Sequence, residues 1–240
     1  VWGTGITGKD WTYFLDFAED SKTKIAFSSS VGTKWESEER EKVKKYLKRF
    51  DAISVREELA QQWIKDMGID AQVTCDPTML WEPAFWENMV TKSSSNERPY
   101  VLVYMWTKDM RTLNHAKEYA RIHGLRVKCQ QFYTPIKGVE NVKPVTLEEW
   151  ISLIANAQTV FTASYHGLLY SLYFHKDVYY YNRENKSRME SLGQELNISH
   201  REIPKEFSER AAIDYDYVDE KLKEKRNYSL QLLKERIKSL

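Results

Sequence analysis

Short apolar runs alternate with amphipathic stretches along the first third of the chain. The pattern predicts strands at 24–30, 51–55 and 71–75, and the stretches between them, 36–50 and 56–68, carry apolar residues at helical spacing. Strands that alternate with helices pair in parallel through right-handed crossovers. This part of the sequence therefore predicts an α/β fold with a parallel sheet.

The ends and faces of these two helices can also be predicted. The helix at 36–50 runs from acidic to basic residues, which is the order that the helix dipole favours. The helix at 56–68 ends at Gly68, a typical stop. In that helix we expect Leu59, Trp63 and Met67 to share one buried side.

The alternation is interrupted at 90–99, where VTKSSSNERP combines small polar residues with a proline, and we place a domain boundary there. The run 100–106 is continuously apolar, as in a central parallel strand. The capping-box spacing of Thr146 and Glu149 predicts a helix start. The remaining predicted elements are helices at 110–123 (closed by Gly124), 146–157, 167–175, 186–196 and 216–240, the last being one helix or a broken pair, and strands at 126–133, 158–164 and 177–182.

With 240 residues, the chain is long enough for two domains. We expect two Rossmann-type halves, at 1–92 and 97–205, and a C-terminal helix at 214–240 that packs back on the first half. The chain begins with VWGTGITG and no methionine, so we expect that sequence upstream of Val1 is missing.

Composition excludes several classes of protein. Lys+Arg 36 against Asp+Glu 35 leaves a net charge of +1, so the molecule as a whole has no electrostatic reason to bind nucleic acid. No apolar run approaches the roughly 20 residues of a membrane span. Cys75 and Cys129 read as reduced core thiols of a cytosolic protein. His166 and His175 lie nine residues apart and no paired-cysteine spacing occurs, so we expect no metal site.

Candidate binding residues follow the predicted strands directly. In an open parallel sheet, ligands bind at the carboxyl ends of the strands, where helix N-termini also offer free N–H groups. Five side chains occupy such positions, each after a predicted strand: Arg56, Asp76, His166, Lys186 and Arg188.

His166 has two readings. It is either an ordinary histidine at a helix start whose ring bonds a nearby carbonyl, or an acid beside a bound anion. The positive end of the helix disfavours imidazolium, and a bound phosphate or carboxylate would reverse that preference. The following Gly167 lacks a side chain that could block the close approach of a ligand.

The other candidates also have structural alternatives. Arg56, in what we expect to be the first turn of a helix, either pairs with Glu57 or Glu58 or satisfies a bound anion. Asp76 precedes a proline and is more typical of a turn than of a catalytic acid. Lys186 and Arg188 alone fit a solvated face. The glycine-rich WGTGITG at 2–8 is a weak ligand-loop signal, because no helix with a ribose-binding acid follows it.

Two long blocks bear a family resemblance. DAISVREELAQQWIKDMGIDAQVTCDPTML and TASYHGLLYSLYFHKDVYYYNRENKSR, with KIAFSSSVG as a weaker third block, strongly resemble the polysaccharide pyruvyl transferases. The resemblance runs from about Val1 to Ile203. It implies a GT-B-like fold of two Rossmann-type parallel-sheet domains facing a cleft, with the acceptor on the first domain and the donor on the second.

The resemblance also implies a reaction. Members of this family transfer the enolpyruvyl unit of phosphoenolpyruvate to two hydroxyls of a sugar and release phosphate. Matched by motif, their arginine falls on Arg56, their histidine on His166 and their downstream basic residue on Lys186. These residues, with Gly167 and Arg188, are then expected to bind phosphoenolpyruvate, which is a co-substrate, and no cofactor is expected. Asp76 is a candidate for deprotonating the sugar.

Alternatives remain at this point. One is a GT-B glycosyltransferase that uses a nucleotide sugar, and another is a non-catalytic carbohydrate-binding protein on the same scaffold. The resemblance implies work on a bacterial surface polysaccharide, such as a capsule or exopolysaccharide, in the cytoplasm, with a sugar or lipid-linked oligosaccharide as acceptor. Peripheral contact with the inner face of the membrane through the basic residues at 221–226 is an alternative to a solvated face. The sequence leaves the oligomeric state open.

Overall fold

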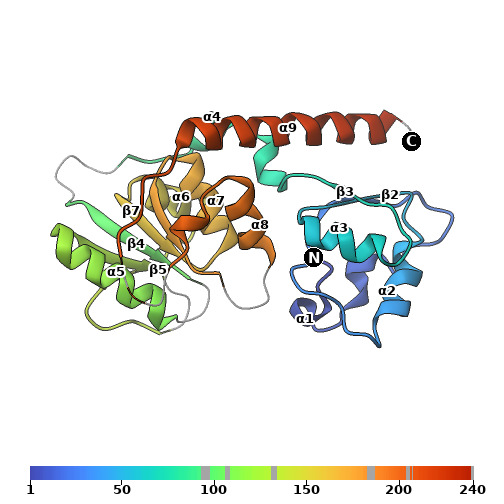
Figure 1. The fold of residues 1–240 in the computed structure, drawn as a ribbon, viewed down its shortest axis with the longest axis horizontal. Helices are drawn as coiled ribbons and strands as arrows, with labels where there is room; N and C mark the ends of the chain where they lie inside the picture. The colour runs from blue at the N-terminus through green and yellow to red at the C-terminus, as the bar shows by residue number, and fades with distance from the viewer. Residues whose placement is uncertain are drawn as a thin grey trace. The chain divides into compact units, whose positions relative to one another are not determined.

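The structure is a computed structural model that describes residues 1–92, 98–105, 109–130, 134–182, 187–203, 206 and 208–238 (Figure 1). The chain divides into two compact units. Unit 1 comprises Val1–Leu80, Glu184–Leu192 and Glu220–Leu240, and unit 2 comprises Trp81–Arg183 and Gly193–Asp219. None of the helices in the described ranges is both long and apolar enough to cross a membrane.

Unit 1 is built on a three-stranded parallel sheet. Its strands are β1 (Ile25–Ser29), β2 (Ala52–Val55) and β3 (Gln72–Val73), in that order across the sheet. The helices α2 (Arg40–Leu47) and α3 (Glu58–Lys65) connect them. This is the parallel α/β arrangement that the sequence pattern predicts.

The N-terminal segment supplies much of the aromatic core of unit 1. Trp2 stacks on Phe14 with ring centroids 5.5 Å apart, and its backbone N–H donates to Ser30 O at 2.7 Å. Along the chain the short helix α1 (Thr4–Thr7) follows Trp2, and Phe14 ends the 3-10 helix η1 (Trp11–Phe14). The WGTGITG stretch therefore forms a short helix at the edge of this core.

The long helix α9 (Tyr215–Lys238) is unbroken, and from Glu220 onward it belongs to unit 1. There it lies against β3: the Ser229 hydroxyl accepts from the backbone N–H of Cys75 at 2.9 Å, and the Tyr228 hydroxyl donates to the Gln72 side chain at 3.2 Å.

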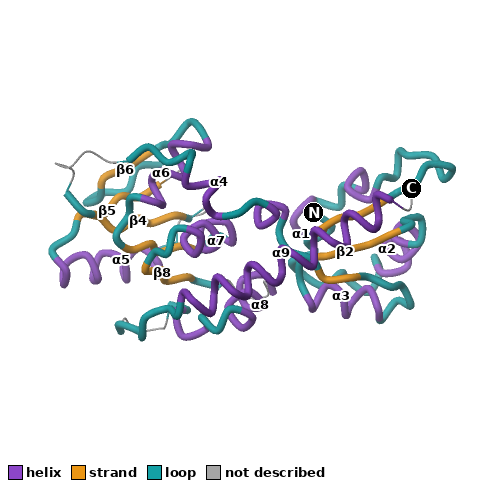
Figure 2. Tube along the Cα trace, turned by 90° about the horizontal axis from the view of Figure 1, so that it is seen from above, coloured by secondary structure: helices purple, strands orange, loops and turns teal. Residues whose placement is uncertain are grey.

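Unit 2 is built on a five-stranded parallel sheet with the order β6-β5-β4-β7-β8 (Figure 2). In β4 every residue is buried, as expected for the central strand. The bounds are β4 (Tyr100–Tyr104), β5 (Arg126–Gln130), β6 (Glu140–Val142), β7 (Thr159–Thr162), β8 (Asp177–Tyr180), α4 (Pro83–Glu87), α5 (Met110–His123), α6 (Leu147–Ala155), α7 (Tyr165–Tyr173), α8 (Ser187–Glu195, whose first residues belong to unit 1) and the 3-10 helix η3 (Ser199–Arg201).

The two faces of this sheet are covered by different helices. Side chains alternate between the faces of a strand. Val101 and Val103 of β4 pack in one cluster with Leu113 of α5. Tyr104, on the opposite face, contacts the ring of Trp150 of α6 with centroids 5.4 Å apart. The α6 face is also the face on which α7 begins.

Several predicted element ends are confirmed. Helix α5 spans Met110–His123 and is closed by Gly124 with φ 66°, a left-handed conformation that glycine adopts without strain. At the start of α6, the Thr146 hydroxyl and the Glu149 carboxylate form the complete capping box. The local chemistry of caps therefore specifies these ends.

Other predictions are wrong. Helix α3 begins at Glu58 and not at Arg56, and it buries Ala60 and Ile64, whereas Leu59 is 44% exposed. Of the predicted buried side, Met67 lies in the core and Trp63 packs against it partly buried. The sequence pattern does not predict strand β6, because it has only three residues, two of them polar, at the sheet edge.

The first unit ends earlier than the predicted boundary at 90–99, of which residues 93–97 lie outside the described part of the chain. Residues from Trp81 onward belong to unit 2, because α4 inserts Trp86 against Tyr170 of α7 with ring centroids 5.1 Å apart. Aromatic packing after Leu80, and not the polar composition of the linker, sets this division.

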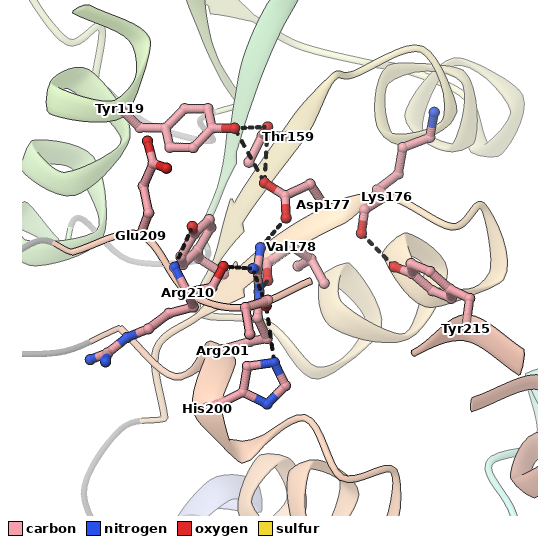
Figure 3. A network of polar contacts seen from close by, with 12 residues as sticks. Tyr119, Thr159, Lys176, Asp177, Val178, His200, Arg201, Glu209, Arg210 and Tyr215 are labelled. Atoms are coloured by element: carbon pink, nitrogen blue, oxygen red, sulfur yellow. Dashed lines mark hydrogen bonds and ion pairs between the residues drawn. The ribbon is translucent and has the colours of Figure 1, made fainter. Parts of the chain in front are cut away.

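A buried arginine fixes the chain that returns after β8 (Figure 3). Arg201 is 1% exposed, forms an ion pair with Asp177 and donates to the carbonyls of Val178 at 3.0 Å and Ala211 at 2.9 Å. Its guanidinium carbon lies 4.0 Å from the centre of the Tyr179 ring. Since Asp177 is the first residue of β8, this network lies at the amino edge of the sheet.

Candidate functional site

Arg56 follows β2 at the carboxyl edge of the unit 1 sheet. Its backbone N–H donates to Ser29 O at 3.2 Å, so the residue still continues the strand pairing with β1. Because α3 begins at Glu58, Arg56 precedes the first helical turn. The predicted pairing with Glu57 or Glu58 is wrong: the Arg56 guanidinium, 10% exposed, forms an ion pair with Asp76.

Asp76 follows β3, the neighbouring strand, and its carboxylate is 2% exposed. One carboxylate oxygen binds Arg56, and the other accepts from the backbone N–H of Thr78 at 2.9 Å and from the Thr78 hydroxyl at 2.8 Å. These contacts start the 3-10 helix η2 (Pro77–Leu80). Asp76 therefore combines the turn role with that of a fixed counter-ion for Arg56.

A second buried carboxylate holds the loop that follows β1. Glu57 is 1% exposed, and its oxygens accept from the Ser30 hydroxyl at 2.5 Å and from the backbone N–H of Val31 at 3.2 Å. Gly32, which follows Val31, has φ 76°, a conformation that favours glycine. Glu57 thus ties the loops after β1 and β2 together at the same edge that carries Arg56.

Of the two predicted basic residues near the start of α8, one can be placed at this edge. Arg188 is the second residue of α8, and a Cβ added to Gly32 would lie 3.7 Å from its Nε atom. The Arg188 side chain therefore reaches the loop after β1. Lys186 lies outside the described residues.

His166 lies at the carboxyl edge of the unit 2 sheet, in the first turn of α7, which directly follows β7. Its side chain is exposed and its ring meets that of Tyr165 edge-on, with centroids 5.4 Å apart. The predicted strand and helix around it are confirmed. An exposed imidazole at a helix N-terminus and strand carboxyl end can meet an anionic ligand.

Gly167 has a packing reason to be glycine. A Cβ at this position would lie 2.3 Å from Thr162 Oγ1 and 2.5 Å from Tyr104 Cδ1. The Cβ position of Gly167 therefore faces the sheet. We expected it to face open space for a ligand, and that expectation is wrong. Its backbone N–H donates to the Ser164 hydroxyl at 3.4 Å.

A small polar network anchors the start of α7. The Thr162 hydroxyl donates to Tyr104 O at 2.9 Å and accepts from the backbone N–H of Ser164 at 3.0 Å. Ser164 is the N-cap of α7. Burial raises the pKa of the Tyr104 phenol, which lies beneath this helix start. The backbone that carries His166 is thereby fixed on β4 and β7.

The predicted residues thus gather at two sheet edges, one in each unit. Arg56, Asp76 and Arg188 lie at the carboxyl edge in unit 1, and His166 and Gly167 lie at the carboxyl edge in unit 2. In the described ranges, no group of three or more His, Cys, Asp or Glu side chains could hold a metal ion. Both cysteines are free and buried.

Sequence reasoning missed the role of Glu57. An acidic residue next to Arg56 is visible in the sequence, but we expected it to pair with that arginine. The actual partners, Ser30 and Val31, follow a different strand. Only the order of strands across the sheet brings those residues together.

Comparisons with solved structures show the fold. A protein from Listeria monocytogenes with the provisional name UDP-N-acetylglucosamine 2-epimerase matches with a TM-score of 0.56 at 11% identity, over 93% of this chain and 66% of that chain. UDP-GlcNAc 2-epimerase from Methanocaldococcus jannaschii matches with 0.43 at 13% identity, over 85% and 62%. UGT2 of Phytolacca americana matches with 0.38 at 13% identity, over 78% and 51%.

The low identities limit what these structural matches show to the fold. The Listeria structure supports the predicted GT-B-like α/β fold with Rossmann-type parallel sheets, and at 11% identity it supports the fold alone. The chain spans less than two thirds of the length of these structures. No curated protein matches the chain. The family model for polysaccharide pyruvyl transferase matches residues 1–185, which is most of the chain, and the protein therefore belongs to the polysaccharide pyruvyl transferase family.

Proposed function

We propose that the protein transfers the enolpyruvyl group of phosphoenolpyruvate to two hydroxyls of a sugar, forming a cyclic ketal and releasing phosphate in the synthesis of a surface polysaccharide. The observation that carries the proposal is the position of His166: an exposed imidazole at the start of α7 within the family match. A helix N-terminus attracts anions, and phosphoenolpyruvate carries two anionic groups.

Arg56 is suited to bind an anion of the donor. A guanidinium offers parallel N–H donors that match a carboxylate, and Asp76 binds its Nη1 atom while the side chain stays 10% exposed. A second cation, Arg188, reaches the loop after β1 at the same edge of unit 1. Lys186 is proposed as a further phosphate contact from the motif match alone.

His166 is the proposed general acid. Protonated beside the phosphate, it gives its proton to the methylene carbon of phosphoenolpyruvate, and the π electrons of the double bond form the new C–H bond. C2 becomes an oxocarbenium-like centre that one sugar hydroxyl attacks with loss of its proton. The C2–O bond to phosphate then breaks, and the second hydroxyl closes the ketal with loss of another proton. General acid catalysis typically contributes about 10²–10⁴-fold.

Asp76 fits a positioning role better than that of the general base. Both carboxylate oxygens are engaged, one by Arg56 and the other by Thr78, and the side chain is 2% exposed. A base must reach the hydroxyl proton that it removes. We therefore assign Asp76 to orienting the Arg56 guanidinium, so that its loss weakens donor binding instead of removing a proton acceptor.

The test is phosphate release from phosphoenolpyruvate with a panel of methyl hexopyranosides as acceptors. His166→Ala should retain the fold, because the side chain is exposed, and should lose about 10²-fold or more in turnover. His200→Ala is the matched control, since His200 contacts Ala211 O on the return segment beyond η3. Near-normal turnover in His166→Ala would remove the proposed acid.

A further inference from the structure

Gln130 ends β5 at the carboxyl edge of the unit 2 sheet. In the register of the sheet it pairs with Tyr104 of β4, which pairs in turn with Thr162 of β7. Residues that pair in a parallel register project their side chains to the same face. Gln130 therefore shares the face of Tyr104 and Thr162, which is the face on which α7 begins.

The side-chain amide oxygen of Gln130 is buried without a hydrogen bond in the described part of the chain. The residue is 4% exposed, and its amide oxygen has no hydrogen-bonding partner among the residues that the structure describes. A buried polar group that lacks a partner is costly, and native proteins keep few of them. Such a group at a ligand-binding edge indicates that its partner belongs to a ligand.

The position of Gln130 relates it to His166 within the same unit. β5 and β7 are separated by β4 alone, so that Gln130 and Thr162 lie about 10 Å apart at two strand spacings. On the other side of β7, Asn182 follows β8 and carries a second buried amide oxygen with no partner in the described part of the chain. Amide groups thus stand on both sides of the strand that leads to His166.

We propose that the Gln130 amide binds a hydroxyl of the acceptor saccharide and thereby positions the acceptor for the reaction, an inference that rests on the proposed function. It places an acceptor contact in unit 2, whereas the family resemblance implies the donor on that domain. An amide oxygen accepts hydrogen bonds and does not donate them. The carboxylate and ionised phosphate of phosphoenolpyruvate also mainly accept, whereas sugar hydroxyls donate. The unmet oxygen of Gln130 therefore matches the acceptor and not the donor substrate.

The test compares Gln130→Met with wild type and with Gln158→Met. Methionine has nearly the shape of glutamine but no hydrogen-bonding amide. Gln158 is exposed at the amino end of β7, at the opposite edge, and gives the matched control. The probes are methyl glucopyranoside, methyl galactopyranoside and methyl mannopyranoside, titrated by saturation-transfer NMR. Phosphoenolpyruvate binding by calorimetry and the melting temperature are measured on the same samples.

Wild type and Gln158→Met should bind at least one of these glycosides, and Gln130→Met should bind it about threefold to tenfold more weakly, the equivalent of one neutral hydrogen bond. Gln130→Met should bind phosphoenolpyruvate unchanged and melt at the same temperature or higher, because the substitution removes a buried amide oxygen that has no partner in the described part of the chain. A lower melting temperature, unchanged glycoside binding, or no glycoside binding by wild type would overturn the inference. Loss of phosphoenolpyruvate binding in wild type would instead contradict the proposed function.

Discussion

The Arg56–Asp76 pair should be one of the most sensitive points of unit 1. The two groups are 10% and 2% exposed, so that a substitution of either leaves a charge in a poorly solvated place. Removing one partner of a buried ion pair typically costs about 3–5 kcal/mol. Asp76→Asn retains an oxygen for Thr78 and removes only the charge, so we expect a loss of about 3 kcal/mol in the free energy of unfolding.

Two further variants separate the ion pair from the turn. Asp76→Ala also removes the cap on Thr78 and should cost about 1 kcal/mol more than Asp76→Asn. Thr78→Val removes one hydroxyl contact and retains the ion pair, so it should cost about 1 kcal/mol. The double variant Arg56→Met/Asp76→Leu removes both charges and should be less destabilised than the sum of its single variants, with a coupling of about 2 kcal/mol or more.

Urea unfolding followed by circular dichroism measures these differences, and thermal melting checks them. For a chain of this size about 1 kcal/mol corresponds to about 2–4 °C, so Asp76→Asn should melt about 6–12 °C lower than wild type. A loss below about 1 kcal/mol for Asp76→Asn, or additive single variants, would refute the reasoning that a buried carboxylate holds Arg56 in place.

Three further outcomes are expected. Gly167→Ala should destabilise unit 2 by about 1–3 kcal/mol, because its Cβ would meet Thr162 and Tyr104 within 2.5 Å. Gly5→Ala, whose Cβ would have its nearest atom at 3.9 Å, should not be destabilised. Equal melting temperatures of the two variants would contradict the packing role of Gly167. Arg201→Met should lower the melting temperature by several degrees, because it loses the Asp177 network. Arg121→Met, at a side chain 72% exposed, should leave the melting temperature unchanged. Equal effects would show that burial of Arg201 contributes nothing to stability. Burial raises the pKa of the Cys129 thiol from 9.0 to about 11, so the unfolded chain ionises first and stability falls as pH rises from about 9 to 11. The melting temperature of Cys129→Ala should therefore depend less on pH over that range. An unchanged pH dependence would contradict the shift.

Local chemistry explains which elements could be predicted from the sequence. Gly124 and the Thr146–Glu149 capping box mark helix ends through contacts within a few residues, and both predictions are confirmed. The position of His166 follows from the apolar run of β7 and the helix after it, so the sequence alone placed it at a strand end. Such features depend on neighbours in the chain and not on the tertiary structure.

Tertiary contacts explain what the sequence left out. Leu59 is exposed because α3 packs on the core through Ala60 and Ile64, which lie on a different side of the helix. The partner of Arg56 is Asp76, twenty residues away, and it is found only when β2 and β3 are known to be adjacent. Nothing in the sequence indicates that the Gln130 amide is buried, since a glutamine is usually exposed.

The identity of the donor is the central claim, and calorimetric titration of phosphoenolpyruvate tests it most directly. Wild type should bind phosphoenolpyruvate, and His166→Ala and Arg56→Lys should bind it more weakly, since the first removes the imidazole and the second removes the bidentate guanidinium but keeps a charge for Asp76. A uridine diphosphate sugar is titrated as the control and should not bind. Binding of the nucleotide sugar without binding of phosphoenolpyruvate would contradict the account and would indicate a glycosyltransferase.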